Sequence, residues 1–195
     1  ERSELSHAEV EEDRWANDSG SYGSPAREGD DDDSDSRDIQ AATTSLREHL
    51  TWQLGLTQFS DRDRSLIRFL IEGLDDDGYL SASLDELLET LPEEYEIELD
   101  ELEVALRQLQ SLDPTGVAAR SPRECLALQL KALPRDAVRD LALVVVEQHL
   151  DLLAARDFNK IKKNTGCNDE ELKAAHALIV GLNPRPGARF AALDT

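Results

Sequence analysis

The sequence contains no methionine and has only half as many basic as acidic residues. Its 21 lysines and arginines against 42 aspartates and glutamates give a net charge of −21 at pH 7. This charge disfavours broad contact with a polyanion, because phosphate binding needs basic side chains. It favours a basic partner instead.

Long apolar runs are also missing. The longest run, near residues 141–146, is far shorter than the roughly 18 residues of a membrane span. No signal peptide is visible either, so we expect a cytoplasmic protein without membrane contact. Because the chain begins with glutamate and lacks methionine, we expect it to be a fragment of a longer protein.

Cysteine and histidine, two common residues of metal and catalytic sites, are sparse. Cys125 and Cys167 lack CxxC spacing, so we expect neither a disulfide nor a zinc site. A calcium loop beginning at Asp75 fails, because Tyr79 and Leu80 occupy the positions that need an oxygen ligand and glycine. The four histidines are scattered, and no phosphate-binding glycine loop appears. We therefore expect no metal, no cofactor and no enzymatic activity.

Leucine-rich segments at helical spacing dominate the chain after residue 43, which predicts an all-α fold of two packed helical subdomains. The run of β-branched residues near 144–146 predicts full burial of its helix. The predicted helices are residues 46–56, 61–74 capped by Ser60, 84–91 capped by Ser83, 100–112 capped by Asp100, 122–133 capped by Ser121, and one long helix from Asp136 to Leu153.

Residues 157–182 have the pattern of a helix-turn-helix, with Gly166 in the turn and Asn168 capping the second helix. That second helix begins with Asp169 and the glutamates that follow it, and these would repel phosphates. The pattern therefore predicts a helix-turn-helix-like subdomain that does not read DNA.

The turn DPTGVAAR, residues 113–120, joins two of the predicted helices. Its proline and glycine end the first helix, and Ser121 with Glu124 forms a predicted capping box for the next. We expect Arg120 to pair with Asp113 or with the C-terminal carbonyls of the preceding helix, unless it contacts a partner directly.

Four stretches of the sequence stand in the order of a known family. Over about residues 46–190 the chain resembles the core-binding region of the sigma-54 family, the enhancer-dependent sigma factors of bacterial RNA polymerase. The stretches are LTWQLGLTQF at 50–59, LDDDGYL at 74–80, DPTGVAAR followed by CLALQL at 113–130, and LNPRPG at 182–187.

The resemblance implies a protein-binding module without chemistry that docks on the RNA polymerase core through its β and β′ subunits. It implies that promoter DNA is contacted only through regions absent from this chain, and that an ATP-driven activator acts on the full factor. The motif positions would fix the fold or contact polymerase: Asp75, Gly78, Tyr79, Leu80, Asp113, Pro114, Gly116, Val117, Ala118, Ala119 and Arg120.

The chain divides by composition. We predict an acidic disordered linker over 1–42, helical subdomains over 43–133 and 134–190, and an exit linker over 191–195. Residues 1–40 carry 14 acidic and four basic side chains, which is typical of a solvated linker or of a DNA mimic lying in a basic channel. The resemblance favours the mimic, because the family has an acidic region before its core-binding domain. The alternative function is a freestanding acidic helical protein, a DNA mimic or anti-factor, that binds some other basic protein.

Overall fold

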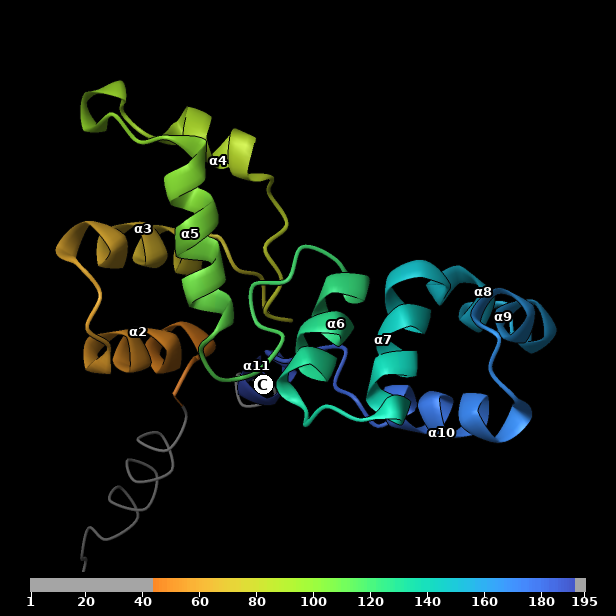
Figure 1. The fold of residues 1–195 in the computed structure, drawn as a ribbon. Coiled ribbons are helices and arrows are strands. Elements are labelled where there is room, and N and C mark those ends of the chain that lie inside the picture. Colours follow the sequence, from red (N-terminus) through yellow and green to blue (C-terminus); the bar gives the residue numbers. More distant parts are fainter. Residues whose placement is uncertain (1–43, 192–195) are drawn as a thin grey trace, which may run out of the picture. The chain divides into compact units, whose positions relative to one another are not determined.

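The computed structural model describes residues 44–191, and this part of the chain is built of helices joined by turns (Figure 1). Within it no strand occurs, apart from an isolated antiparallel bridge between Leu74 and Leu80. The predicted all-α class is confirmed, whereas the predicted acidic arm lies outside the described residues. The elements are α2 (Leu46–Leu56), α3 (Asp61–Glu72), α4 (Leu84–Thr90), the 3-10 helix η1 (Glu93–Tyr95), α5 (Leu99–Gln110), α6 (Pro122–Ala132), α7 (Ala137–Gln148), α8 (Leu150–Ala154), α9 (Phe158–Thr165), α10 (Asp169–Val180) and α11 (Ala188–Ala191).

Short polar side chains begin most of these helices. A cap of this kind satisfies a backbone N–H group that has no partner inside the helix. The side chains of Ser60, Ser83, Ser121, Asp136 and Asn168 accept hydrogen bonds from the N–H groups of Asp63, Glu86, Glu124, Arg139 and Glu171. Four of these caps were predicted from the sequence, and Asp136 was predicted to open its helix.

The start of α5 differs from the prediction. Glu98, not Asp100, is the N-cap residue, and its N–H donates to the Glu101 side chain at 3.0 Å. Asp100 lies inside the first turn, where its negative charge faces the positive end of the helix dipole.

The predicted long helix from Asp136 to Leu153 is wrong, because it is divided into α7 and α8 at His149. His149 has φ −131° and ψ 22°, which is not a helical conformation. The predicted full burial of its β-branched run is also wrong. Val145 and Val146 are buried, but Val144 is 37% exposed.

The first apolar core joins α2, α3, α4 and α5. Leu50, Ile67, Leu70, Leu102 and Leu109 are fully buried members of this core. Helices α3 and α5 form the most extensive helix pair of this core. Burial of large side chains at helical spacing explains why each helix presents one apolar face.

The second apolar core joins α6, α7, α9 and α10, with Leu130, Val145, Ile161 and Leu172 among its buried members. Arg139 closes the corner between α6 and α7, because its Nε donates to the Leu130 carbonyl at 2.9 Å. Helix α6 thus packs in the second core, although the sequence assigned residues 43–133 to the first subdomain. The subdomain boundaries themselves remain a prediction.

The helix-turn-helix pattern is present in this second core. Helix α9 ends at Gly166, which has a left-handed φ of 74°, and Asn168 then caps α10. Among the described helices, none is both long and apolar enough to cross a bilayer.

Candidate functional site

The stretches that carry the family resemblance meet in space, and one hydrogen bond there joins residues that are 105 positions apart in the chain. We call this place the motif junction. It consists of Gln53 and residues 74–80, 113–120, 125–129 and 183–187. Its geometry decides which motif side chains face solvent and which hold the fold together.

Residues 74–80 form a tight turn that follows α3. The N–H group of Gly78 donates to the Asp75 carbonyl at 3.0 Å, and the N–H group of Tyr79 donates to Asp75 Oδ1 at 2.9 Å. Gly78 has φ 88°, a conformation that residues with a Cβ rarely adopt. The sequence DDDG therefore forms a turn that the Asp75 side chain stabilises by a hydrogen bond.

This turn pairs with the DPTGVAAR segment. Ala118 N–H donates to the Gly78 carbonyl at 2.8 Å, and Leu80 N–H donates to the Ala119 carbonyl at 3.0 Å. Ala118 and Ala119 are fully buried, and Ala118 has a left-handed φ of 61°. Two motifs that lie about forty residues apart thus support one another through backbone hydrogen bonds.

Gly116 lets this segment approach α6 closely. It has φ 95°, and a Cβ there would lie 2.9 Å from both Cys125 Sγ and Gln129 Nε2. Burial raises the pKa of the Cys125 thiol, which keeps the group neutral at physiological pH.

Residues 183–187 close the junction from the other end of the chain. Gly187 N–H donates to the Asp77 carbonyl at 2.9 Å, and the Tyr79 hydroxyl donates to the Pro184 carbonyl. Asn183 is held in both directions by Gln129, whose Oε1 accepts from Asn183 N–H at 2.8 Å while its Nε2 donates to the Asn183 carbonyl. Burial raises the pKa of Tyr79, so its hydroxyl stays protonated and remains a donor.

Glutamines that the sequence prediction did not single out brace the junction. The Gln53 amide holds the backbone of Asp113 in both directions, accepting from its N–H at 2.8 Å and donating to its carbonyl. Gln110 Nε2 donates to the Ala118 carbonyl at 3.1 Å. Gln53 and Gln129 stand inside the quoted motifs, and that position was the available signal for them.

Arg120 does not form the predicted pair with Asp113 or with the end of the preceding helix. Its Nε donates to Glu124 Oε2 at 3.0 Å, and the Arg120 N–H donates to the same oxygen at 2.8 Å. Glu124 therefore reaches back to Arg120 and not to Ser121, so the predicted capping box is only half formed. Burial acts to raise the pKa of Glu124, but its hydrogen bonds from Arg120 and Gln110 outweigh burial and lower it.

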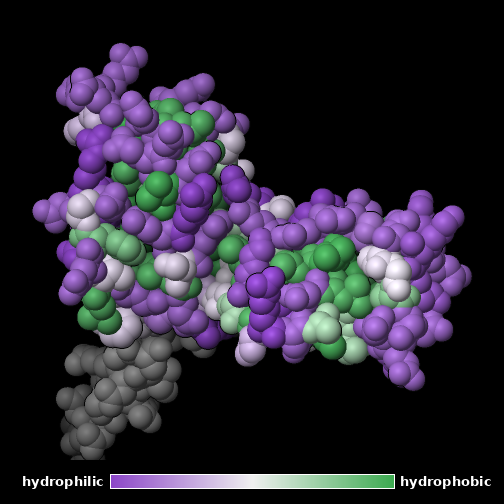
Figure 2. Space-filling view, in the orientation of Figure 1, coloured by the Kyte–Doolittle hydropathy of each residue, from purple (hydrophilic) through white to green (hydrophobic). Residues whose placement is uncertain are grey.

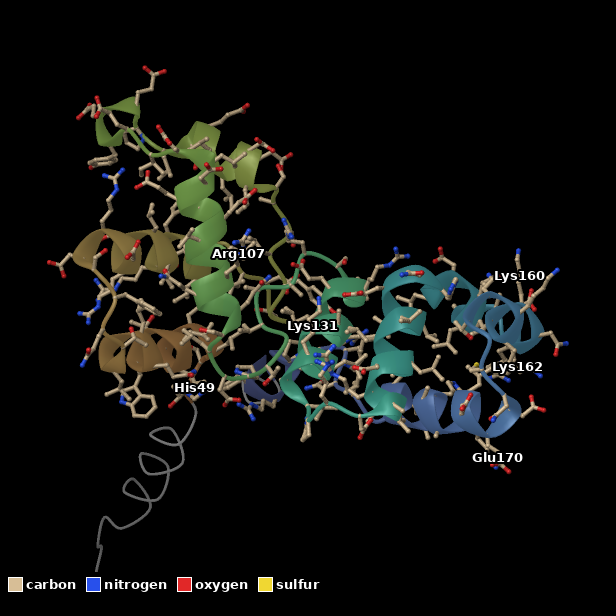
Figure 3. All side chains as sticks on the ribbon, in the orientation of Figure 1. His49, Arg107, Lys131, Lys160, Lys162 and Glu170 are labelled. Carbon is tan, nitrogen blue, oxygen red and sulfur yellow. The ribbon has the colours of Figure 1, made fainter. Side chains whose placement is uncertain are left out.

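Asp113 pairs elsewhere. Its Oδ2 lies 3.4 Å from an Arg189 guanidinium nitrogen and 3.6 Å from His49 Nε2. These contacts join the start of the turn to α2, on which Figure 3 marks His49, and to α11. The Asp113 side chain remains 66% exposed.

The motif positions therefore fall into two groups. Asp75, Asp113 and Arg120 are exposed, and Tyr79 is half-buried. The buried positions are Gly78, Leu80, Pro114, Gly116, Val117, Ala118 and Ala119.

The polar side chains of the junction hydrogen-bond mainly to backbone atoms of neighbouring segments. Gln53, Gln110 and Gln129 each do so, and so does Tyr79. Within residues 44–191 no group of three or more potential ligands is placed to hold a metal ion. The fold and the junction define an all-helical module whose motifs stabilise its own corners.

Comparison with known proteins identifies the family. Residues 35–195 match the family model described as the sigma-54 factor, core binding domain. The chain is 41% identical over 162 residues to the RNA polymerase sigma-54 factor of Pseudomonas aeruginosa (strain UCBPP-PA14), and 43% identical over 162 residues to that of Azotobacter vinelandii. It is 40% identical over 146 residues to that of Escherichia coli (strain K12). These alignments cover 81%, 81% and 74% of this chain, and 33%, 32% and 30% of the relatives.

The chain therefore belongs to the sigma-54 factor family and carries its core-binding domain. It spans about a third of the length of these relatives. The resemblance drawn from the four sequence motifs is confirmed.

Proposed function

We propose that this chain is a module that binds the core of bacterial RNA polymerase. The observation that carries the proposal is the match of residues 35–195 to the sigma-54 core-binding domain. The motif junction supports it, because the stretches typical of the family are also those that hold the described fold together.

We propose that the β and β′ subunits of polymerase form the surface that this module meets. Promoter DNA and an ATP-driven activator would act through other parts of the factor, of which this chain spans about a third. The net charge of −21 supports this division, because it disfavours contact with DNA phosphates. Because polymerase acts in the cytoplasm, we place the protein there.

We propose that the module has no catalytic activity of its own. The glutamine side chains of the motif junction are occupied by hydrogen bonds to the protein's own backbone. The buried motif positions would then act on binding through the fold, while the exposed Asp75, Asp113 and Arg120 are the members available to a partner.

The freestanding acidic protein is the second candidate, and the strong acidity of residues 1–40 is the observation that favours it. It predicts that the acidic arm carries most of the affinity for a basic partner. The identity of about 40% with sigma-54 factors favours the polymerase-binding module instead.

The test is capture of purified bacterial RNA polymerase core enzyme by the full 195-residue chain, repeated after deletion of residues 1–40. We expect the shortened chain to retain binding. Loss of all binding on deletion would favour the acidic interaction protein. No capture by the full chain at low salt would count against the polymerase-binding module.

A further inference from the structure

An apolar groove lies between α3 and the segment that joins α4 to α5. It encloses about 450 Å³, within the range of about 300–1,000 Å³ that is usual for binding pockets. Apolar side chains dominate its lining, with Ser65 and Arg62 at the polar positions. The apolar lining residues are Leu66, Phe69, Leu91, Tyr95 and Ile97.

Arg62 fixes the wall of this groove. Its guanidinium donates to both carboxylate oxygens of Glu101, at 2.7 and 3.0 Å, and to the carbonyls of Tyr95 and Glu96, at 3.2 and 3.1 Å. Glu96 has a left-handed φ of 47°, which turns the chain back toward α5. The groove is therefore a built feature, because one side chain of α3 holds the segment opposite to it.

The apolar lining is partly open to solvent in the part of the chain that the structure describes, since Leu66 is buried but Phe69, Leu91 and Ile97 are only half-buried. The Tyr95 side chain is 59% exposed, although it has a large apolar ring. Figure 2 shows apolar surface between hydrophilic side chains over the region of α3, α4 and α5. An exposed apolar groove with a polar rim is typical of a docking site.

The side of the groove opposite α3, which we call the acidic rim, has one sign of charge. Residues 84–106, which include α4, η1 and most of α5, contain ten acidic side chains and no basic one. In Figure 3 the side chains around this segment end mostly in oxygen. The one basic side chain that lines the groove, Arg62, is already paired with Glu101.

Charge excludes several occupants. A second copy of this chain carries a net charge of −21, and residues 1–40 carry 14 acidic against four basic side chains, so the acidic rim repels both. Nucleic acid is repelled for the same reason. The occupant whose charge complements the acidic rim is a basic protein segment.

We propose that this groove is the docking site for a lysine- or arginine-rich segment of the RNA polymerase core that inserts at least one large apolar side chain. The apolar floor supplies affinity, and the acidic rim attracts and orients the segment. The inference rests on the proposed function, and it adds the surface used and the chemistry of the partner segment.

The first test fills the groove without changing charge. Ser65 is exposed on α3 and lines the groove, so Ser65→Trp places a large ring where the partner side chain would insert. Thr51→Trp is the matched control, because Thr51 is an exposed polar residue on the neighbouring α2. We expect Ser65→Trp to weaken binding of the full chain to purified core polymerase at least tenfold, and Thr51→Trp to leave it unchanged.

The second test reverses charge on the rim. Glu94 adjoins Tyr95 and is exposed, so Glu94→Lys changes the rim with little effect on folding. Glu170→Lys makes the same charge change on α10, where Figure 3 marks Glu170. We expect a several-fold loss of affinity in Glu94→Lys only. This variant keeps the proposal testable if Ser65→Trp fails to fold, which a urea unfolding curve of each variant reveals.

The outcomes separate the two proposals. Binding by the unaltered chain with selective loss in Ser65→Trp and Glu94→Lys supports the groove. If folded Ser65→Trp and Glu94→Lys bind as well as the unaltered chain, or no worse than their controls, the groove is not the docking site and polymerase binding stands. Absence of binding by the unaltered chain overturns both.

Discussion

Gly187 occupies a position in the motif junction that has no room for a side chain. A Cβ there would lie 2.5 Å from the Asp76 carbonyl oxygen and 2.7 Å from Gly78 N, and backbone atoms cannot move aside as a flexible side chain does. We therefore predict that Gly187→Ala lowers the free energy of unfolding by about 1–3 kcal/mol, the usual cost of overpacking.

Gly55 provides the control for this measurement. It lies in α2, and a Cβ there would meet no atom within 4 Å. Gly55→Ala should raise stability by up to about 0.5–1 kcal/mol, because alanine loses less backbone freedom on folding. Urea unfolding of both variants checks the pair. An unchanged midpoint for Gly187→Ala would show that the junction yields more easily than its backbone contacts indicate.

The pair of Arg62 and Glu101 predicts a dependence of stability on pH. The hydrogen bond from Arg62, followed by that from the Glu98 backbone, lowers the pKa of Glu101 from 4.5 to about 2. A carboxyl group whose pKa is lower in the folded state stabilises the fold above its unfolded pKa, and this contribution is lost as pH falls toward 2. We predict that Arg62→Gln removes this contribution.

The measurement compares urea midpoints at pH 7 and pH 3. Arg62→Gln should lower the midpoint at pH 7 and have less effect at pH 3. Arg107→Gln is the control, because Arg107 is an exposed residue of α5 that is marked in Figure 3 and lies 3.6 Å from Glu103. Exposed pairs of this kind contribute little. Equal losses in the two variants would mean that Arg62 contributes no more than a surface pair.

The role of a single residue could be predicted where the local sequence offered only one candidate for that role. Ser60 and Ser83 are caps because each precedes a leucine-rich helix, and each hydroxyl accepts a hydrogen bond from a backbone N–H group of the first turn. The prediction of Asp100 as the cap was wrong because α5 begins at Leu99, where the Glu98 N–H donates to the Glu101 side chain, and the local sequence does not rank this start against one at Asp100. Arg120 failed because its partner, Glu124, was already assigned to Ser121 by the capping-box pattern.

Helices were predictable from leucine spacing, but their interruptions were less so. The break at His149 contains neither proline nor glycine, and the apolar pattern continues across it into α8. The packing partner of α6 was hard to predict for a related reason. The apolar face of α6 could pack against the first or the second core. Only its contact with α7 in the structure places it in the second core.

Helix α5 allows a comparison of buried and exposed apolar side chains on one element. Leu106 is 3% exposed in the first core, whereas Val104 is 45% exposed on the same helix. We predict that Leu106→Ala lowers the free energy of unfolding by about 2–5 kcal/mol, because it removes transfer energy and leaves a cavity. Val104→Ala should cost far less. Chemical denaturation of the two variants checks this, and similar costs would contradict the assigned packing of α5.

Across the whole described chain, the convergence of the motifs could not be derived from their spacing. Tyr79 and Pro184 are 105 residues apart, and neither carries a local signal for the other. The family resemblance identified the same stretches but did not predict that they lie together. The structure shows what links them: backbone hydrogen bonds between the stretches, and further hydrogen bonds from glutamine side chains to the backbone.

The acidity of the whole molecule leads to a prediction about salt. If an acidic rim attracts a basic segment of polymerase, added salt screens that attraction, since the screening length falls from about 10 Å at 0.1 M to about 3 Å at 1 M. The affinity of the full chain for core polymerase should therefore fall steadily as sodium chloride rises from 0.1 to 0.5 M. Glu94→Lys should show a shallower fall, because one attractive charge has become repulsive.

Ser65→Trp gives the complementary result. It occupies the apolar floor and leaves the net charge at −21, so its affinity should be lower at every salt concentration but should fall with the same slope as that of the unaltered chain. Binding titrations at four or more salt concentrations distinguish slope from offset. If Ser65→Trp changed the slope as much as Glu94→Lys, the apolar floor and the charged rim would not be separable contributions, and the two-part description of the groove would be wrong.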